Sequence, residues 1–157
     1  MDHPTNIEEA DIWIDRFKRN GKEILKNGLI SGIVILIVSN GGLFVAIRLF
    51  PDFFIDYISP VFNSDGSRDT LFYLHPFVLA TSLAVFWNRF RKYFTGNILK
   101  IGVEFGVLYA FVALLPILWI TYAAMDISFQ MIATWMIYGL FQTTVAGITF
   151  GWLQSKK

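Results

Sequence analysis

The sequence predicts an all-α integral membrane protein, an antiparallel four-helix bundle preceded by an N-terminal amphipathic interfacial helix. Two observations support this prediction. The chain of 157 residues is 55% hydrophobic and only 16% charged, whereas soluble domains are about 25% charged. The charged residues also gather in the first 26 positions and in the connections, which leaves long apolar stretches between them.

Residues 1–26 are the polar part of the chain, and residues 27–157 form the expected membrane domain. Thr5 and Glu8 have the spacing of a capping box, which indicates that a helix begins there. Apolar residues then recur at helical spacing, with charged residues on the opposite face. We expect this amphipathic helix to lie at the membrane surface, where it leads into the first span or docks on a partner.

Four segments reach the length of about 17–25 residues that a membrane-spanning helix needs. They cover approximately residues 28–50, 71–90, 98–123 and 127–153. Pro51 ends the first span, and the third contains Pro116. The first connection begins with a stretch, Pro51 to Ile58, that we expect to form a short helix at the outer interface. Only a short turn separates the last two spans, which predicts a helical hairpin.

The distribution of basic residues predicts that both chain ends lie in the cytoplasm. Eleven Lys and Arg residues fall before the first span, between the second and third, and after the fourth; two fall on the other side. Short cytoplasmic connections carry an excess of Lys and Arg. We therefore expect a multi-pass plasma membrane protein, and its compactness and short connections favour a bacterial inner membrane.

Small residues spaced by four mark the expected packing faces. They are Gly139, Thr143, Gly147 and Gly151 in the fourth span, with Gly102 and Gly106 in the third. Such stripes let two helix backbones approach closely. They predict that the third and fourth spans cross here, or that one stripe joins two copies of the chain.

Large aromatic residues stand near the predicted span ends. They are Trp87, Tyr93, Trp119, Tyr122 and Trp152. Trp and Tyr are enriched where a membrane meets water. We expect these side chains to anchor the helices at the two interfaces.

Glu104 is the one acidic residue inside a predicted span. An ionisable side chain at such depth indicates a functional site by default, for a proton, a cation or a cationic substrate. Lys100 lies one helical turn earlier on the same face, so an ion pair between the two is the structural alternative.

Asn40 and Gln142 fall near the middle of the first and fourth spans. If those helices are neighbours, the two amides form an interhelical hydrogen bond or a small polar site for a ligand. His75, near the outer start of the second span, is a structural residue or a member of a proton or metal site with the outer acids. Nothing in the spacing requires a metal or another cofactor, so neither is predicted.

Several function classes are excluded or disfavoured. Without cysteine, disulfides and thiolate chemistry are impossible, and a net charge of +1 argues against nucleic-acid binding. No catalytic or nucleotide-binding motif is present, although an enzyme is not excluded. The favoured function is a non-catalytic accessory subunit of a membrane complex, with lipid and a membrane-protein partner or a second copy around it. The alternatives are an oligomeric transporter or channel using Glu104, Asn40 and Gln142, and a lipid- or quinone-binding protein or enzyme.

Overall fold

The computed structural model describes the backbone of residues 6–58 and 66–156, and the side chains from residue 20 onward within these ranges. This part of the chain is helical and contains no strand. Its elements are α1 (Asn6–Leu49), η1 (Pro51–Ile58), α2 (Asp69–Phe90), η2 (Arg91–Tyr93), α3 (Ile98–Tyr109), η3 (Ala110–Leu114), α4 (Leu115–Ala124) and α5 (Phe129–Ser155).

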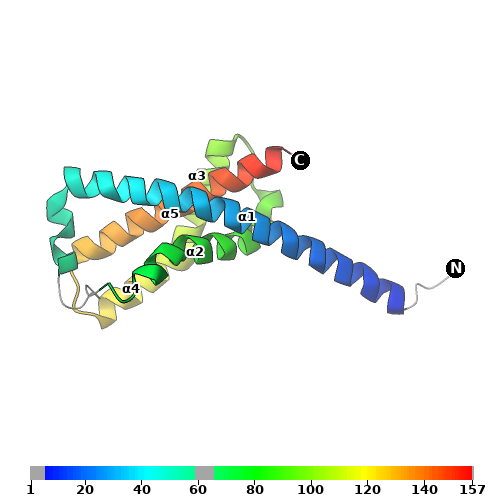
Figure 1. Cartoon of the computed structure of the whole chain (residues 1–157), viewed down its shortest axis with the longest axis horizontal. Coiled ribbons are helices and arrows are strands. Elements are labelled where there is room, and N and C mark those ends of the chain that lie inside the picture. Colours follow the sequence, from blue (N-terminus) through cyan, green and yellow to red (C-terminus); the bar gives the residue numbers. More distant parts are fainter. Residues whose placement is uncertain (1–5, 59–65, 157) are drawn as a thin grey trace.

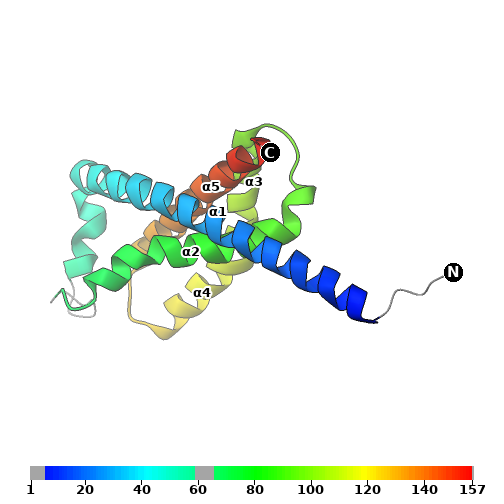
Figure 2. The same ribbon diagram turned by 45° about the vertical axis from the view of Figure 1, so that its right-hand side comes forward.

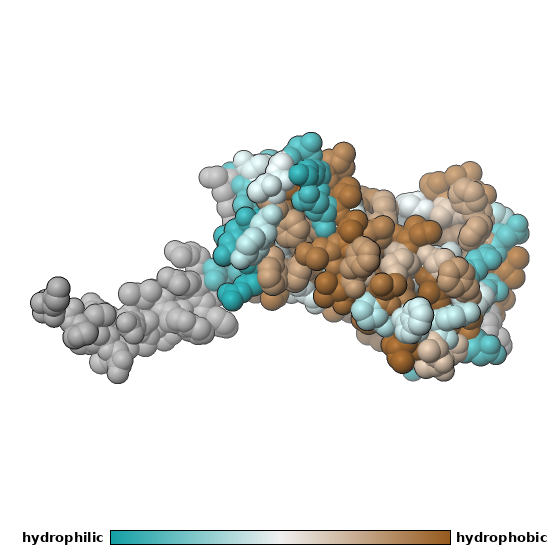
Figure 3. Space-filling view, turned by 180° about the vertical axis from the view of Figure 1, so that it is seen from behind, coloured by the Kyte–Doolittle hydropathy of each residue, from teal (hydrophilic) through white to brown (hydrophobic). Residues whose placement is uncertain are grey.

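The four expected spans are present as helices that are long and apolar enough to cross a membrane. They cover Asn20–Leu49, Asp69–Tyr93, Ile98–Ala124 and Phe129–Ser155. In Figure 1, α1 runs from right to left, whereas α2 and α5 run from left to right. Hydrophobic residues dominate the middle of the face in Figure 3, and hydrophilic residues gather toward its two ends.

The polar N-terminal segment and the first span form one helix, which differs from the separate interfacial helix expected from the sequence. α1 is continuous over 44 residues, because no proline stands between Asn6 and Pro51. Its first part continues the axis of the span and extends away from the other helices (Figure 1). A single unbroken helix cannot both cross a membrane and lie flat on it. Thr5 and the side chains of residues 6–19, which make up most of the amphipathic face, lie outside the described residues.

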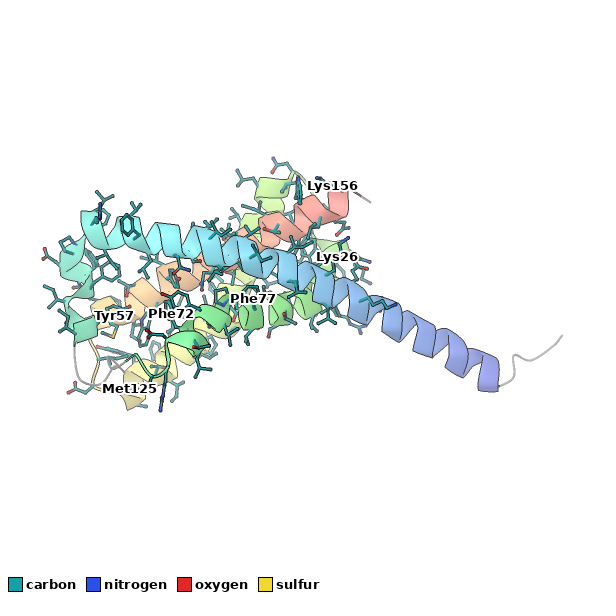
Figure 4. The ribbon with its side chains drawn as sticks, in the orientation of Figure 1. Lys26, Tyr57, Phe72, Phe77, Met125 and Lys156 are labelled. Carbon is teal, nitrogen blue, oxygen red and sulfur yellow. The ribbon has the colours of Figure 1, made fainter. Side chains whose placement is uncertain are left out.

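Two glycines set the distance between α1 and α2, which lie side by side in Figures 1 and 2. A Cβ atom on Gly28 would lie 2.9 Å from the Cα of Thr81, and one on Gly32 would lie 3.2 Å from the Cα of Phe77. Figure 4 shows Phe77 where α2 passes α1. Larger residues at these positions would push the two backbones apart.

The third span is not a uniform α-helix. α3 passes into a π-helical turn, η3, before α4 begins. The backbone N–H of Leu115 donates to the carbonyl of Ala110, five residues back, and Pro116 follows immediately. Proline has no N–H and its ring clashes with the carbonyl four residues earlier. The wider turn accommodates that residue without breaking the helix.

A short 3₁₀ helix, η1, follows α1, in the part of the chain where a short helix was expected. Polar contacts tie η1 to the start of α5. The Tyr57 and Thr134 hydroxyls lie 3.1 Å apart, and Gln130 Nε2 donates to the carbonyl of Asp52 at 3.3 Å. The Ser128 hydroxyl donates to Asp56 and also accepts the backbone N–H of Met131, which caps α5.

Aromatic rings fill the core near the opposite end. Trp87 is only 2% exposed and stacks on Phe94, with a centroid distance of 5.6 Å. Phe105 and Phe150 pack on the same indole ring, at 5.6 and 5.7 Å. The prediction that Trp87 is an interfacial anchor is therefore wrong, because its position in α2 turns it toward α3 and α5. The other four expected anchors are exposed.

Candidate functional site

The buried polar side chains of the described residues all come from two helices. Those in α1 are Asn27, Ser31 and Ser39, and those in α5 are Gln142, Thr143 and Thr149. α1 and α5 are in contact. We call this set the α1–α5 polar seam. Buried polar groups need hydrogen-bond partners, so the seam is the candidate functional site.

Two of the six seam side chains are satisfied within their own helix. The Thr143 hydroxyl donates to the carbonyl of Gly139 at 2.8 Å, and the Thr149 hydroxyl donates to the carbonyl of Val145 at 2.8 Å. In contrast, the Ser31 Oγ, Ser39 Oγ and Gln142 Nε2 atoms are buried and have no hydrogen-bond partner. Leaving such a group unpaired costs about 1–3 kcal/mol.

The expected pairing of Asn40 with Gln142 is absent. Asn40 is half-buried, and its Nδ2 donates to the carbonyl of Leu36 in its own helix at 2.7 Å. Gln142 Nε2 has no partner. Successive residues of an α-helix point about 100° apart, and it is Ser39 that α1 turns into the interior. The sequence signal for Ser39 was only its place beside Asn40.

Glu104 does not enter the seam. Its carboxylate lies 3.5 Å from the Lys100 ammonium, and the two side chains are 43% and 57% exposed. Lys100 and Glu104 are one helical turn apart and form the ion pair that was the structural alternative to a functional role for Glu104. An exposed ion pair on the outside of α3 has no wall of protein around it to form a cation site.

We expect Glu104→Gln to change the free energy of unfolding by no more than about 0.5 kcal/mol, because exposed ion pairs contribute little. Denaturation by SDS in mixed micelles would measure this change. Glu23→Gln is the matched control, since Glu23 is 20% exposed and accepts a 2.7 Å hydrogen bond from Arg91. A loss for Glu104→Gln that exceeds the loss for Glu23→Gln would contradict the peripheral role of Glu104.

His75 is exposed near the start of α2, just before the buried Pro76. Among the residues that the structure describes, no three His, Asp or Glu side chains gather to hold a metal ion. His75 thus belongs to no such group with Asp52, Asp56 or Asp126.

The small residues expected to pack lie mainly between α3 and α5. A Cβ on Gly106 would meet the Thr144 side chain, and one on Gly102 would meet Ile148. On the facing helix, a Cβ on Gly147 would lie 3.0 Å from the Cα of Gly102.

The ends of the α5 stripe differ from its centre. Gly139 faces Leu114, the last residue of η3, where a Cβ would lie 2.7 Å from a methyl carbon of that leucine. Gly151 has room for a Cβ, which would make ordinary contacts of 3.6 and 3.7 Å with Ile101 and Ile98. α3 and α5 thus approach each other most closely at Gly102, Gly106 and Gly147.

No protein-family model, curated protein or solved structure matches the chain. Its function is therefore argued from its own residues.

Proposed function

We propose that the chain is a non-catalytic subunit of a larger membrane assembly in the plasma membrane. It would insert as an antiparallel four-helix bundle with both ends in the cytoplasm. The proposal rests on the low burial of α4 by the other helices of the chain. One of its ten residues, Leu118, is buried, and among the described elements α4 contacts only α5 and η3. A helix with so little contact to its own chain is available to a neighbouring one.

The exposed face of α4 and η3 is rich in large side chains. They include Phe111, Trp119 and Tyr122, of which Trp119 is 76% exposed. Aromatic residues are enriched in protein interfaces. In no span is more than 33% of the most apolar stretch buried inside the chain, so the four helices leave most of their surface for lipid and partners.

The charge distribution supports the proposed orientation. Lys26 and Lys156 lie toward one end of the molecule, and Tyr57 and Met125 lie toward the other (Figure 4). The basic η2 segment joins the first end, whereas Asp52 and Asp56 of η1 belong to the second. An excess of Lys and Arg is typical of the cytoplasmic side.

Photo-crosslinking in native membranes tests the proposal. A photoreactive amino acid at position 119 should give a defined adduct with one other membrane protein, identified by mass spectrometry. The control is the same residue at position 37, because Ile37 is 67% exposed on α1, away from α4. Adducts at position 119 that contain lipid alone would overturn the proposal.

An adduct with a second copy of this chain would instead favour an oligomeric transporter or channel. The unpaired Ser39 and Gln142 side chains support that second candidate, because buried polar groups at depth mark substrate or ion pathways. The Glu104 and Asn40 positions do not support it. Within the described ranges no group of three His, Asp or Glu side chains could hold a metal ion, so no observation of this kind favours a metal-dependent membrane enzyme.

A further inference from the structure

Two unpaired polar side chains of the α1–α5 polar seam belong to different helices and are almost completely enclosed. Ser39 is 1% exposed and Gln142 is 2% exposed. Neither the Ser39 Oγ nor the Gln142 Nε2 atom has a hydrogen-bond partner. The third unpaired group, Ser31, stands two helical turns from Ser39 on α1.

Ser39 and Gln142 lie at the same level of the molecule. A Cβ on Gly42 would lie 3.7 Å from the ring of Phe141, so these two residues are neighbours across α1 and α5. Ser39 is three residues before Gly42, and Gln142 is one residue after Phe141. Because the helices run in opposite directions (Figure 1) and rise about 1.5 Å per residue, both residues lie on the same side of that contact, within one turn of each other.

The level is deep within both spans. Ser39 is ten residues from Leu49, the end of α1, and Gln142 is thirteen residues from Phe129, the start of α5. These separations correspond to about 15 Å and about 20 Å along the helices. Bulk solvent does not reach such a position, so the polar atoms need a partner that is held by the protein.

We propose that Ser39 and Gln142 form a binding site for a single water molecule that bridges α1 and α5. The Gln142 Nε2 group donates and needs an acceptor, while a serine hydroxyl both donates and accepts. The oxygen of a water molecule accepts from Gln142, and one of its hydrogens is donated to Ser39. Buried waters typically join such otherwise unsatisfied groups. A larger ligand could reach these two side chains only if α1 and α5 separated, because both are almost completely enclosed.

The chain contains three glutamines, Gln130, Gln142 and Gln154, which makes the site directly observable. Protein labelled with ¹⁵N in glutamine alone gives three side-chain amide signals in solid-state NMR of the full chain in liposomes. Gln130 and Gln154 are exposed and serve as positive references. We expect magnetisation to pass from water to the Gln142 amide as well. If no magnetisation passes from water to the Gln142 amide, the proposal is overturned. That result would mean that the contact is dry or that Ser39 and Gln142 bond directly.

Two serine variants assign the water to its site. Ser39→Ala should remove most of the transfer to Gln142 and leave that to Gln130 and Gln154 unchanged. Ser31→Ala is the matched control, because it removes an equally buried and unpaired hydroxyl at another level, and transfer to Gln142 should persist. Equal losses in both variants would contradict the site. If Ser39→Ala does not fold, Ser39→Cys replaces it, because a thiol is a weaker hydrogen-bonding group and should weaken the transfer.

Discussion

Replacing Gly147 with alanine should lower the free energy of unfolding by about 1–3 kcal/mol, the usual cost of forcing extra atoms into a packed contact. The new Cβ would lie 3.0 Å from the Cα of Gly102 and 3.0 Å from the Cβ of Phe105. Neither atom can move aside by a change of rotamer, so α3 and α5 must separate. SDS-induced unfolding in mixed micelles, followed by circular dichroism, measures the loss.

Gly41→Ala is the matched control for that experiment. Gly41 is also inside a helix, but a Cβ there would meet nothing within 4 Å. Alanine is favoured over glycine in a helix by up to about 1 kcal/mol, so this variant should be as stable as the parent chain or more stable. If both variants behave alike, the crossing of α3 and α5 does not limit stability.

Replacing Trp87 with alanine should cost about 3–5 kcal/mol, the range found for large aromatic residues in cores. The indole ring contacts Phe94, Phe105 and Phe150, so its removal takes away the centre of a cluster that joins α2, α3 and α5. The same unfolding measurement applies, and the variant should also lose near-ultraviolet circular dichroism.

Trp119→Ala provides the comparison for Trp87→Ala, since it deletes the same side chain from an exposed position on α4. Its effect on the isolated chain should stay within about 0.5 kcal/mol. An equally large loss at both positions would mean that the aromatic cluster is not the specific source of stability.

Hydropathy predicted the four spans because a membrane helix needs an uninterrupted apolar length, whatever it packs against. The direction in which a residue points around its helix is a different quantity. Trp87 has the depth of an interfacial anchor, yet its side chain enters the core. Likewise Asn40 is more polar than the adjacent Ser39, but the packing of α1 turns Ser39 inward. Such choices depend on neighbouring helices that no local pattern specifies.

The π-helical turn η3 shows the same limit. Pro116 is evident in the sequence of the third span, but no π-helical turn was predicted from it. Gly102, Gly106, Leu114 and Leu118 stand at multiples of four residues, and all are buried or contact α5. In a regular α-helix of 3.6 residues per turn this stripe would drift steadily around the helix. A turn with hydrogen bonds five residues apart contains more residues, and it brings the stripe back toward α5.

The unbroken course of α1 has a mechanical consequence. Forty-four helical residues extend over about 66 Å, whereas the hydrocarbon core of a bilayer is about 30 Å thick. In the proposed insertion, about half of the helix would lie outside that layer and would continue, without a break, the half that contacts α2 and α5. A tilt of about 10° in the inner half would carry Asn6 sideways by roughly 5 Å or more, as the helical rise of 1.5 Å per residue implies. Any rotation of the half that packs on α2 and α5 would therefore be larger, as a displacement, at the N-terminal end of the same helix.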